Sequence, residues 1–104
     1  MTSGWSLTLY VSGAAPRSIQ AITTVRAVCD EQPDRQLALT VVDAADHPGR
    51  ALRDDVVALP TLVKQGPGPV RHLVGNLTDP AHVRGWLDQV LGAGSSTVDD
   101  GSRP

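Results

Sequence analysis

The stretch Leu59 to Asp79, LPTLVKQGPGPVRHLVGNLTD, decides the fold. Pro60 opens a short strand at residues 61–64, and a turn rich in Gly and Pro leads back into a second strand at residues 70–74. The pattern predicts a β-hairpin that the chain enters through a constrained proline. In an X-Pro bond the cis isomer is only about 0.5–1 kcal/mol less favourable than trans, so a tight entry can select it, and the sequence leaves the isomer open.

The first half of the chain predicts a parallel βαβ unit. Residues 6–11, SLTLYV, suit a central strand, and Pro16 fits the first position of a helix that continues to about Cys29. Residues 37–43, LALTVVD, predict a second, buried strand, and a right-handed crossover would join the two. The helix carries an apolar stripe at spacings of three and four residues, made of Ile19, Ile22, Val25, Val28 and Cys29.

The second half adds a weaker helix before the hairpin and a stronger one after it. Residues 46–55 favour a short helix whose start is left open by Pro48 and Gly49. After the hairpin, Thr78 or Asp79 is the expected N-cap of a last helix that begins near Pro80. Its apolar stripe consists of Val83, Trp86, Leu87, Val90 and Leu91. Residues 1–91 are therefore expected to form one domain, and residues 92–104, which lack an apolar period, a disordered tail.

Composition narrows the class of protein. The 104 residues suffice for one core, and 40% apolar residues without any Phe make that core aliphatic. A net charge of −2 provides no basic field for nucleic acid. A single cysteine excludes an internal disulfide and a Cys-x-x-Cys pair, and no apolar run approaches the roughly 20 residues that cross a bilayer. We expect a cytoplasmic protein without contacts to nucleic acid or membrane.

The order β-α-β-(α)-β-β-α with a strand-opening proline predicts an α/β, thioredoxin-like domain with a mixed four-stranded sheet. Enzymes of this fold keep a nucleophilic thiolate at the turn after the first strand, where the helix N-terminus stabilises it. This chain has Ser12-Gly13-Ala14-Ala15 at that turn. The scaffold is thus predicted without its usual redox chemistry and without a cofactor.

Several short motifs, at spacings that need no gap, resemble the KaiB family of circadian-clock proteins. They are LYVSG at residues 9–13, PRS at 16–18, Val42-Asp43, PTLVK at 60–64, and then Pro67, Pro69, Val70, Arg71, Gly75, Leu77 and Asp79. The resemblance covers residues 7–91. It implies a non-enzymatic protein that binds the RecA-type ATPase KaiC, with KaiA-like or SasA-like proteins as further partners. It also implies a fold switch, in which the C-terminal half changes between an oligomeric ground state and a thioredoxin-like binding state.

The chain departs from the family pattern at three places. The turn has Pro67-Gly68-Pro69 where the family usually has three prolines, Leu59 replaces a Thr, and Trp86 stands where the last helix commonly has a Gly two residues before Asp88. A bulky indole on the helical stripe favours a regular, buried helix. Our hypothesis is that this chain rests in the thioredoxin-like state, as a monomer or dimer, without a populated second fold.

Three side chains of the hairpin are the candidate partner-binding residues: Lys64, Arg71 and His72. Cations brought together by a hairpin must find carboxylates inside the domain or face an acidic partner. The sequence alone leaves both readings open, and the resemblance favours the partner. Tyr10 is expected to pack in the first strand, with its hydroxyl hydrogen-bonded if it is buried. Pro60, Trp86 and Asp88 are the other expected structural residues.

Chemically active alternatives have weaker support. Cys29 lies on the apolar stripe of the first helix, where a free thiol usually acts as a small buried hydrophobe. His47, His72 and His82 belong to separate elements, without the close pairing typical of zinc ligands, so no metal is expected. Two alternatives to a KaiB-like protein remain: a stand-alone counterpart of the KaiB-like sensor domain of the SasA kinase, and a thioredoxin-like thiol enzyme that uses Cys29.

Overall fold

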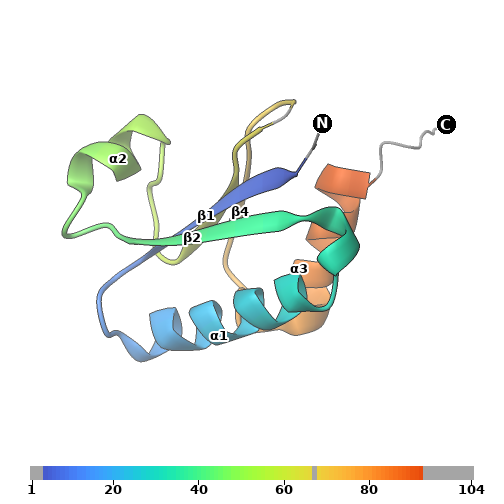
Figure 1. Ribbon diagram of the computed structural model, residues 1–104. Helices are drawn as coiled ribbons and strands as arrows, with labels where there is room; N and C mark the ends of the chain where they lie inside the picture. The colour runs from blue at the N-terminus through green and yellow to red at the C-terminus, as the bar shows by residue number, and fades with distance from the viewer. Residues whose placement is uncertain (1–3, 67, 93–104) are drawn as a thin grey trace, which may run out of the picture.

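The computed structural model describes residues 4–66 and 68–92, which form a four-stranded mixed sheet with helices on both faces (Figure 1). The strands are β1 (Trp5–Val11), β2 (Leu37–Asp43), β3 (Thr61–Lys64) and β4 (Arg71–Val74). The helices are α1 (Pro16–Asp30), α2 (Pro48–Arg53) and α3 (Pro80–Leu87), together with a 3-10 turn at Pro33–Arg35 and a π-helical turn at Asp88–Gly92.

The strand order β2-β1-β3-β4 confirms the predicted thioredoxin-like arrangement. β1 runs parallel to β2, with Trp5 opposite Leu37, and antiparallel to β3. β3 and β4 form the predicted hairpin, with Lys64 opposite Arg71. Since side chains alternate along a strand, this register decides which residues face each layer of helices.

The main core lies between the sheet and the pair α1 and α3, which cover the same face in Figure 1. Alternate residues of β1 point into it, and Leu7 and Leu9 have no exposed surface. α3 contributes side chains four residues apart and begins at the predicted N-cap, where the Asp79 carboxylate accepts a hydrogen bond from the Ala81 amide at 3.0 Å. The buried members from the helices are Ala21, Val25, Val28, Cys29, Val83, Leu87 and Leu91.

A smaller core on the opposite face holds α2 against the sheet. It consists of Tyr10, Val42, Ala51 and Val63. The Tyr10 side chain is fully buried, and its hydroxyl donates to the carboxylate of Asp54, directly after α2. Gln65 donates to the same carboxylate oxygen at 3.0 Å. Tyr10 therefore packs in the first strand and finds the expected hydrogen bond, which ties the end of α2 to β1.

Two burial predictions are wrong. β2 is an edge strand, and its Ala38 and Thr40 are exposed, because α2 covers only part of that face. Ile19 is 51% exposed, while Ser18 and Ala21 are buried in its place. Ser18 faces inward because its hydroxyl accepts a hydrogen bond from the Ser12 amide at 2.9 Å, which turns the packing face of α1 away from Ile19.

The sequence left the isomer of the Pro60 bond and the start of α2 open, and the structure shows both. The Leu59–Pro60 peptide is cis, and α2 is a single short helix that begins at Pro48. Trp86 is half-buried and packs against the main core. The predicted disordered tail lies outside the described residues, except for Gly92 at the end of the π-helical turn.

The helical form of residues 80–91 should be the only populated one, because Val83, Leu87 and Leu91 fill the main core only as a helix. We expect one set of amide resonances, with helical chemical shifts across this segment, and a monomer or dimer in size-exclusion chromatography with light scattering. Strand-type shifts in residues 80–91, or a tetramer, would contradict the hypothesis of a single fold.

Replacing Tyr10 with Phe should lower the free energy of unfolding by about 1–2 kcal/mol, because it removes a buried hydrogen bond to a carboxylate while leaving the ring in place. Urea denaturation followed by circular dichroism measures the change. Thr23→Val is the matched control, because it removes a hydroxyl whose 3.2 Å hydrogen bond lies on the exposed face of α1. An equal loss in both variants would argue against a structural role for the Tyr10–Asp54 pair.

A candidate binding cleft beside Pro60

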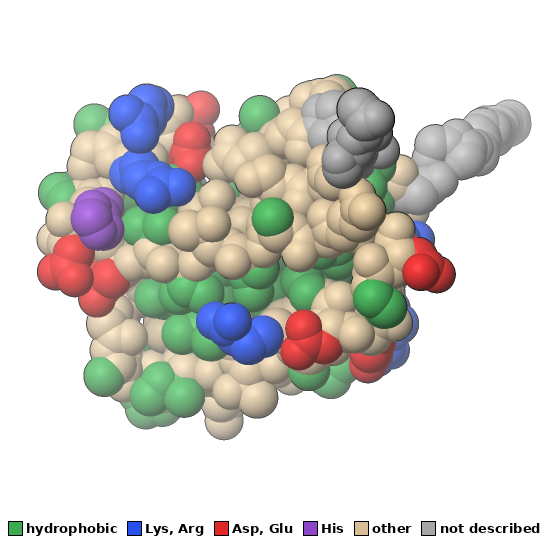
Figure 2. Space-filling view, in the orientation of Figure 1, with side chains coloured by type: hydrophobic (Ala, Val, Ile, Leu, Met, Phe, Trp, Pro, Cys, Tyr) green, Lys and Arg blue, Asp and Glu red, His purple; other side chains and the backbone are tan. Residues whose placement is uncertain are grey.

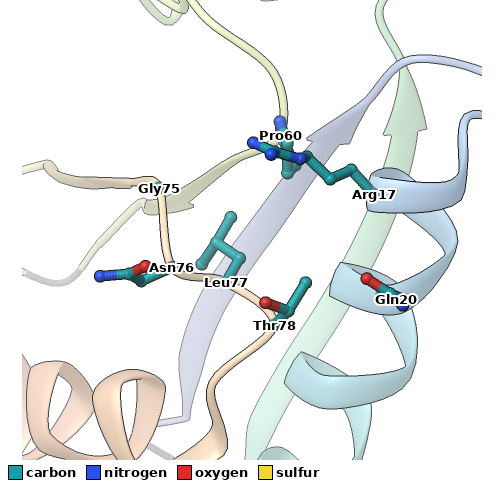
Figure 3. Close-up of a pocket in the computed structure, with 7 residues that line it drawn as sticks. All are labelled: Arg17, Gln20, Pro60, Gly75, Asn76, Leu77 and Thr78. Carbon is teal, nitrogen blue, oxygen red and sulfur yellow. The ribbon is translucent and has the colours of Figure 1, made fainter.

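A cleft of about 250 Å³ lies between α1 and the loop that joins β4 to α3 (Figure 3). Figure 3 shows the side chain of Arg17 reaching from α1 toward Pro60, while Gln20 and Thr78 lie on either side of the cleft. The lining residues are Arg17, Gln20, Pro60, Gly75, Asn76, Leu77 and Thr78.

The loop is shaped by two consecutive residues with positive φ angles, Gly75 at 82° and Asn76 at 52°. Glycine adopts this left-handed conformation without the penalty that a side chain brings, and Asn tolerates it better than most residues. Leu77 then anchors the loop in the main core, with only 2% of its surface exposed. The hydroxyl of Thr24 on α1 lies 3.5 Å from the Thr78 carbonyl, so the two walls of the cleft are in contact.

The cleft offers a ligand one cation and several neutral polar groups. Arg17 is exposed and makes no ion pair with any residue in the described ranges, and Gln20 and Thr78 add hydrogen-bonding groups. A neighbouring groove of about 430 Å³ shares Gln20 and Thr78 and adds the exposed Ile19. A cation, neutral polar groups and an apolar side chain can thus contact one ligand surface, whereas the residues that line the cleft include no thiol, carboxylate or imidazole.

The register of the hairpin divides the three predicted partner-binding residues between two faces of the sheet. Lys64 and Arg71 are opposite each other and lie on the face of α3. His72 is opposite Val63, on the face of α2. The predicted proximity of Lys64 and Arg71 is present, but His72 belongs to different surroundings.

Lys64 is buried, with 2% of its surface exposed. Its ammonium group donates to the Pro69 carbonyl at 2.7 Å and lies 5.5 Å from the centroid of the Trp5 ring. Burial lowers the pKa of Lys64, and the neighbouring charge of Arg71 lowers it further. Arg71, by contrast, is exposed and accessible to a partner.

His72 is exposed and contacts the end of α2. Its Nε2 lies 2.7 Å from the Asp54 carbonyl oxygen, and because a carbonyl only accepts, Nε2 carries the hydrogen. The Asp54 carboxylate accepts hydrogen bonds from Tyr10 and Gln65. Burial raises the pKa of Tyr10, and the neighbouring Asp54 carboxylate raises it further. Asp54 thus connects β1, α2 and the hairpin.

Asp88, another of the predicted structural residues, lies directly after α3. Asp88 begins the π-helical turn and forms a 3.0 Å ion pair with Arg35, which follows α1 in the 3-10 turn. Arg84 pairs with Glu31 at 3.0 Å and holds the pKa of that carboxyl below its usual range. Both pairs connect the region after α1 to α3.

The described residues include neither a cluster of metal ligands nor a membrane-spanning helix, and they give little support for thiol chemistry. Within residues 4–66 and 68–92, no three His, Cys, Asp or Glu side chains lie close enough to hold a metal ion. None of the helices in these ranges is long and apolar enough to cross a membrane. Burial raises the pKa of the Cys29 thiol to about 11, so very little reactive thiolate exists at neutral pH. On the face in Figure 2, positive and negative side chains are interspersed rather than gathered into one field.

Sequence reasoning missed the cleft and the role of Asp54. Arg17 and Gln20 are identifiable as outward residues of α1, but only the tertiary structure brings residues 75–78 against them. The sequence predicts that Tyr10 has a hydrogen-bond partner, because a buried tyrosine hydroxyl requires one. Nothing in the spacing showed that this partner would come from residue 54.

The fold is that of a thioredoxin-like domain whose β1–α1 turn holds no cysteine. The family model of the KaiB domain matches residues 8–89. The chain is 39% identical over 82 residues to the circadian clock oscillator protein KaiB of Microcystis aeruginosa, covering 79% of each chain. It is 37% identical over 86 residues to KaiB of Synechococcus elongatus, covering 83% of this chain and 84% of the relative. The chain belongs to the KaiB family.

Solved structures confirm the fold. The N-terminal domain of SasA from Synechococcus elongatus superposes with a TM-score of 0.77 at 24% identity, covering 93% of this chain and 91% of that domain. Thioredoxin from Fasciola hepatica gives a TM-score of 0.69 at 17% identity, covering 83% and 80%. The described chain therefore has the thioredoxin-like arrangement, as the sequence predicts.

The raised pKa of Cys29 predicts slow alkylation. At pH 8 iodoacetamide should modify the native protein at least about a hundredfold more slowly than the urea-unfolded chain, because two pKa units correspond to a hundredfold less thiolate and burial adds to this. Intact-mass spectrometry measures both rates. Equal rates would show that Cys29 is an accessible thiol and would revive the thiol-enzyme alternative.

The same shift makes native stability depend on pH. The folded state holds the thiol proton more tightly than the unfolded state, so Cys29 should lower the free energy of unfolding as the pH rises from the ordinary thiol value of 9.0 toward about 11. Urea titrations from pH 8 to 11 compare the protein with Cys29→Ala, whose stability lacks this contribution. Parallel curves for the two proteins would contradict the raised pKa.

Proposed function

We propose that this chain is a non-enzymatic regulatory protein that associates with a KaiC-like RecA-type ATPase, in circadian or related signalling. The observation that carries the proposal is its membership of the KaiB family, whose matched relatives are named as circadian clock oscillator proteins. The mechanism is regulated association, in which no covalent bond is made or broken. KaiA-like or SasA-like proteins and a second copy of the chain are further partners under this proposal, and its location is cytoplasmic.

The Pro60 cleft and the adjoining groove on α1 are the surface we assign to the ATPase. Two features support this assignment. Arg17 presents an exposed positive charge without an ion pair in the described ranges, and Ile19 presents an apolar side chain that is 51% exposed although its helix is otherwise amphipathic. Arg17 lines the cleft and Ile19 lines the adjoining groove, and Gln20 and Thr78 border both; Thr78 belongs to the loop that Leu77 fixes in the core. A rigid surface of mixed character costs little ordering entropy on binding.

A second candidate is a stand-alone adaptor similar to the sensor domain of SasA, which would bind the same kind of ATPase without any change of fold. The helical α3, with Trp86 packed against the core, favours it over a fold-switching protein. The thiol-enzyme alternative loses support, because Cys29 is buried and its pKa is raised.

The test begins with capture of partners from native lysate by the immobilised full chain, with and without ATP, followed by mass spectrometry. Under the proposal a RecA-type ATPase is retained in a nucleotide-dependent way. The captured ATPase is then purified, and its affinity is measured for Arg17→Glu and Ile19→Asp. We expect each variant to weaken binding at least about tenfold. Arg17→Glu replaces a positive charge with a negative one, and Ile19→Asp places a carboxylate where an apolar side chain would contact the partner.

Arg53→Glu is the matched control, because it makes the same charge change on an exposed residue of α2, across the sheet from α1. Unchanged affinity in this variant separates a local contact from an effect of net charge. If the ATPase is present in the lysate and is never retained, the proposed function is wrong. If it binds all variants equally, the function stands and the Pro60 cleft is the wrong surface.

A further inference from the structure

The strand β4 has one edge without a partner strand. The strand order β2-β1-β3-β4 puts it at the end of the sheet, where β3 pairs with one of its sides only. Alternate residues of such a strand direct their N–H and C=O groups away from the partner. Among residues 4–66 and 68–92, none forms a backbone–backbone hydrogen bond to β4 beyond the hairpin ladder. The outward groups of β4 are therefore a template for another extended segment.

Contacts on both faces of the sheet hold β4 in place. Leu73 packs into the main core, with 8% of its surface exposed. On the other face, Nε2 of the His72 ring donates to the Asp54 carbonyl at 2.7 Å. Neither contact uses the backbone groups along the open edge. An edge that is ordered before binding loses little entropy when a peptide joins it.

The side chains of β4 define which peptide fits. Arg71 lies on the face of α3, and Val74 lies opposite Thr61 on the face of α2. Arg71 is exposed and forms no ion pair with any residue that the structure describes, and Val74 is 53% exposed. Residues opposite each other on adjacent strands point to the same face and interact. A peptide strand can thus place a carboxylate beside Arg71 and, three residues away, an apolar side chain beside Val74.

Charge decides which extended segment suits this edge. The stretch 66–78 contains Arg71 and neither Asp nor Glu, so β4 of a second copy of the chain could not supply the carboxylate. It would instead bring two guanidinium groups to one pair of short strands, and like charges across strands are unfavourable. An acidic, β-branched segment of another protein supplies both the charge and the apolar contact.

We propose that the open edge of β4 binds an extended acidic segment of a protein partner, which joins the four-stranded sheet as a further strand with a carboxylate beside Arg71. Main-chain hydrogen bonds supply the affinity, and the side chains beside Arg71 and Val74 supply the selectivity. This surface goes beyond the proposed function, because none of residues 71–74 lines the Pro60 cleft.

The experiment is an NMR titration of the full chain, labelled with ¹⁵N, in low salt. The probe is a blocked Thr-Val-Thr-Val-Glu-Thr peptide, whose Glu lies beside Arg71 and whose first Val lies beside Val74 when it pairs antiparallel with β4. We expect saturable shifts of the amides of residues 71–74. The amides of β2, the other edge of the sheet, should shift less, because residues 37–43 include no cation.

Matched changes separate the charge from the main-chain pairing. Replacing Arg71 with Gln, or the Glu of the peptide with Gln, should weaken binding about fivefold, the effect of losing one partly exposed charge pair. Arg53→Gln removes an exposed arginine from α2, on one face of the sheet, and should leave the affinity unchanged. Two complementary peptides are also N-methylated at alternate residues. The one that has lost the N–H groups facing β4 should not bind.

Four outcomes would overturn the proposal. The first is no saturable shift at residues 71–74, which would mean that Arg71 protects the edge against pairing. The second is equal affinity for the Glu and Gln peptides, and the third is binding of both N-methylated peptides. The fourth is a shift of these amides when Asp99→Asn and Asp100→Asn are introduced without any peptide, which would show that an acidic segment of this chain occupies the edge. Because the readout uses no ATPase, a negative result here leaves the proposed function standing.

Discussion

The structure depends on the burial of β1 on both of its faces. Leu7 and Leu9 are fully buried in the main core, while Thr8 and Tyr10, which alternate with them, are buried on the opposite face. β1 also has a paired strand on each side. A shift of one residue would exchange the two sets of side chains, so the register of this strand is strongly specified. Its two faces in turn determine that α1 and α3 pack on one side and α2 on the other.

The polar contacts on the two faces of the sheet contribute unequally to stability. On the α2 face, the buried Tyr10 hydroxyl requires a partner, and Asp54 meets this need while also accepting from Gln65. On the other face, the ion pairs Arg84–Glu31 and Arg35–Asp88 are largely exposed. Exposed pairs contribute little stability, whereas a buried polar group left without a partner is costly. The position of α2 therefore depends on hydrogen bonding, and that of α3 mainly on its apolar stripe.

The element boundaries were predictable because their signals are local. Apolar and β-branched runs define the strands, Pro16 and the Asp79–Pro80 pair define the starts of two helices, and the Gly and Pro turn defines the hairpin. Burial was predicted less well. On α1, a one-residue change turns the packing face by about 100°, which is the difference between burying Ile19 and burying Ser18.

The surroundings of the candidate site residues were hard to predict for the same reason. An apolar run such as residues 37–43 suits an edge strand as well as a buried one, and only the strand order decides. The proximity of Lys64 to Arg71 follows from the hairpin alone, but the burial of Lys64 depends on Trp5, which is far away in the sequence. The Pro60 cleft likewise requires the packing of residues 75–78 against α1, which no local pattern encodes.

The thioredoxin-like scaffold here has no cysteine at the β1–α1 turn, and its hairpin has a cavity beside each end. Pro60 and Gly75 flank one end of β3 and β4, and Lys64 and Arg71 stand at the other. A four-residue strand spans roughly 13 Å. The cavities beside the two ends of the hairpin are therefore separate surfaces.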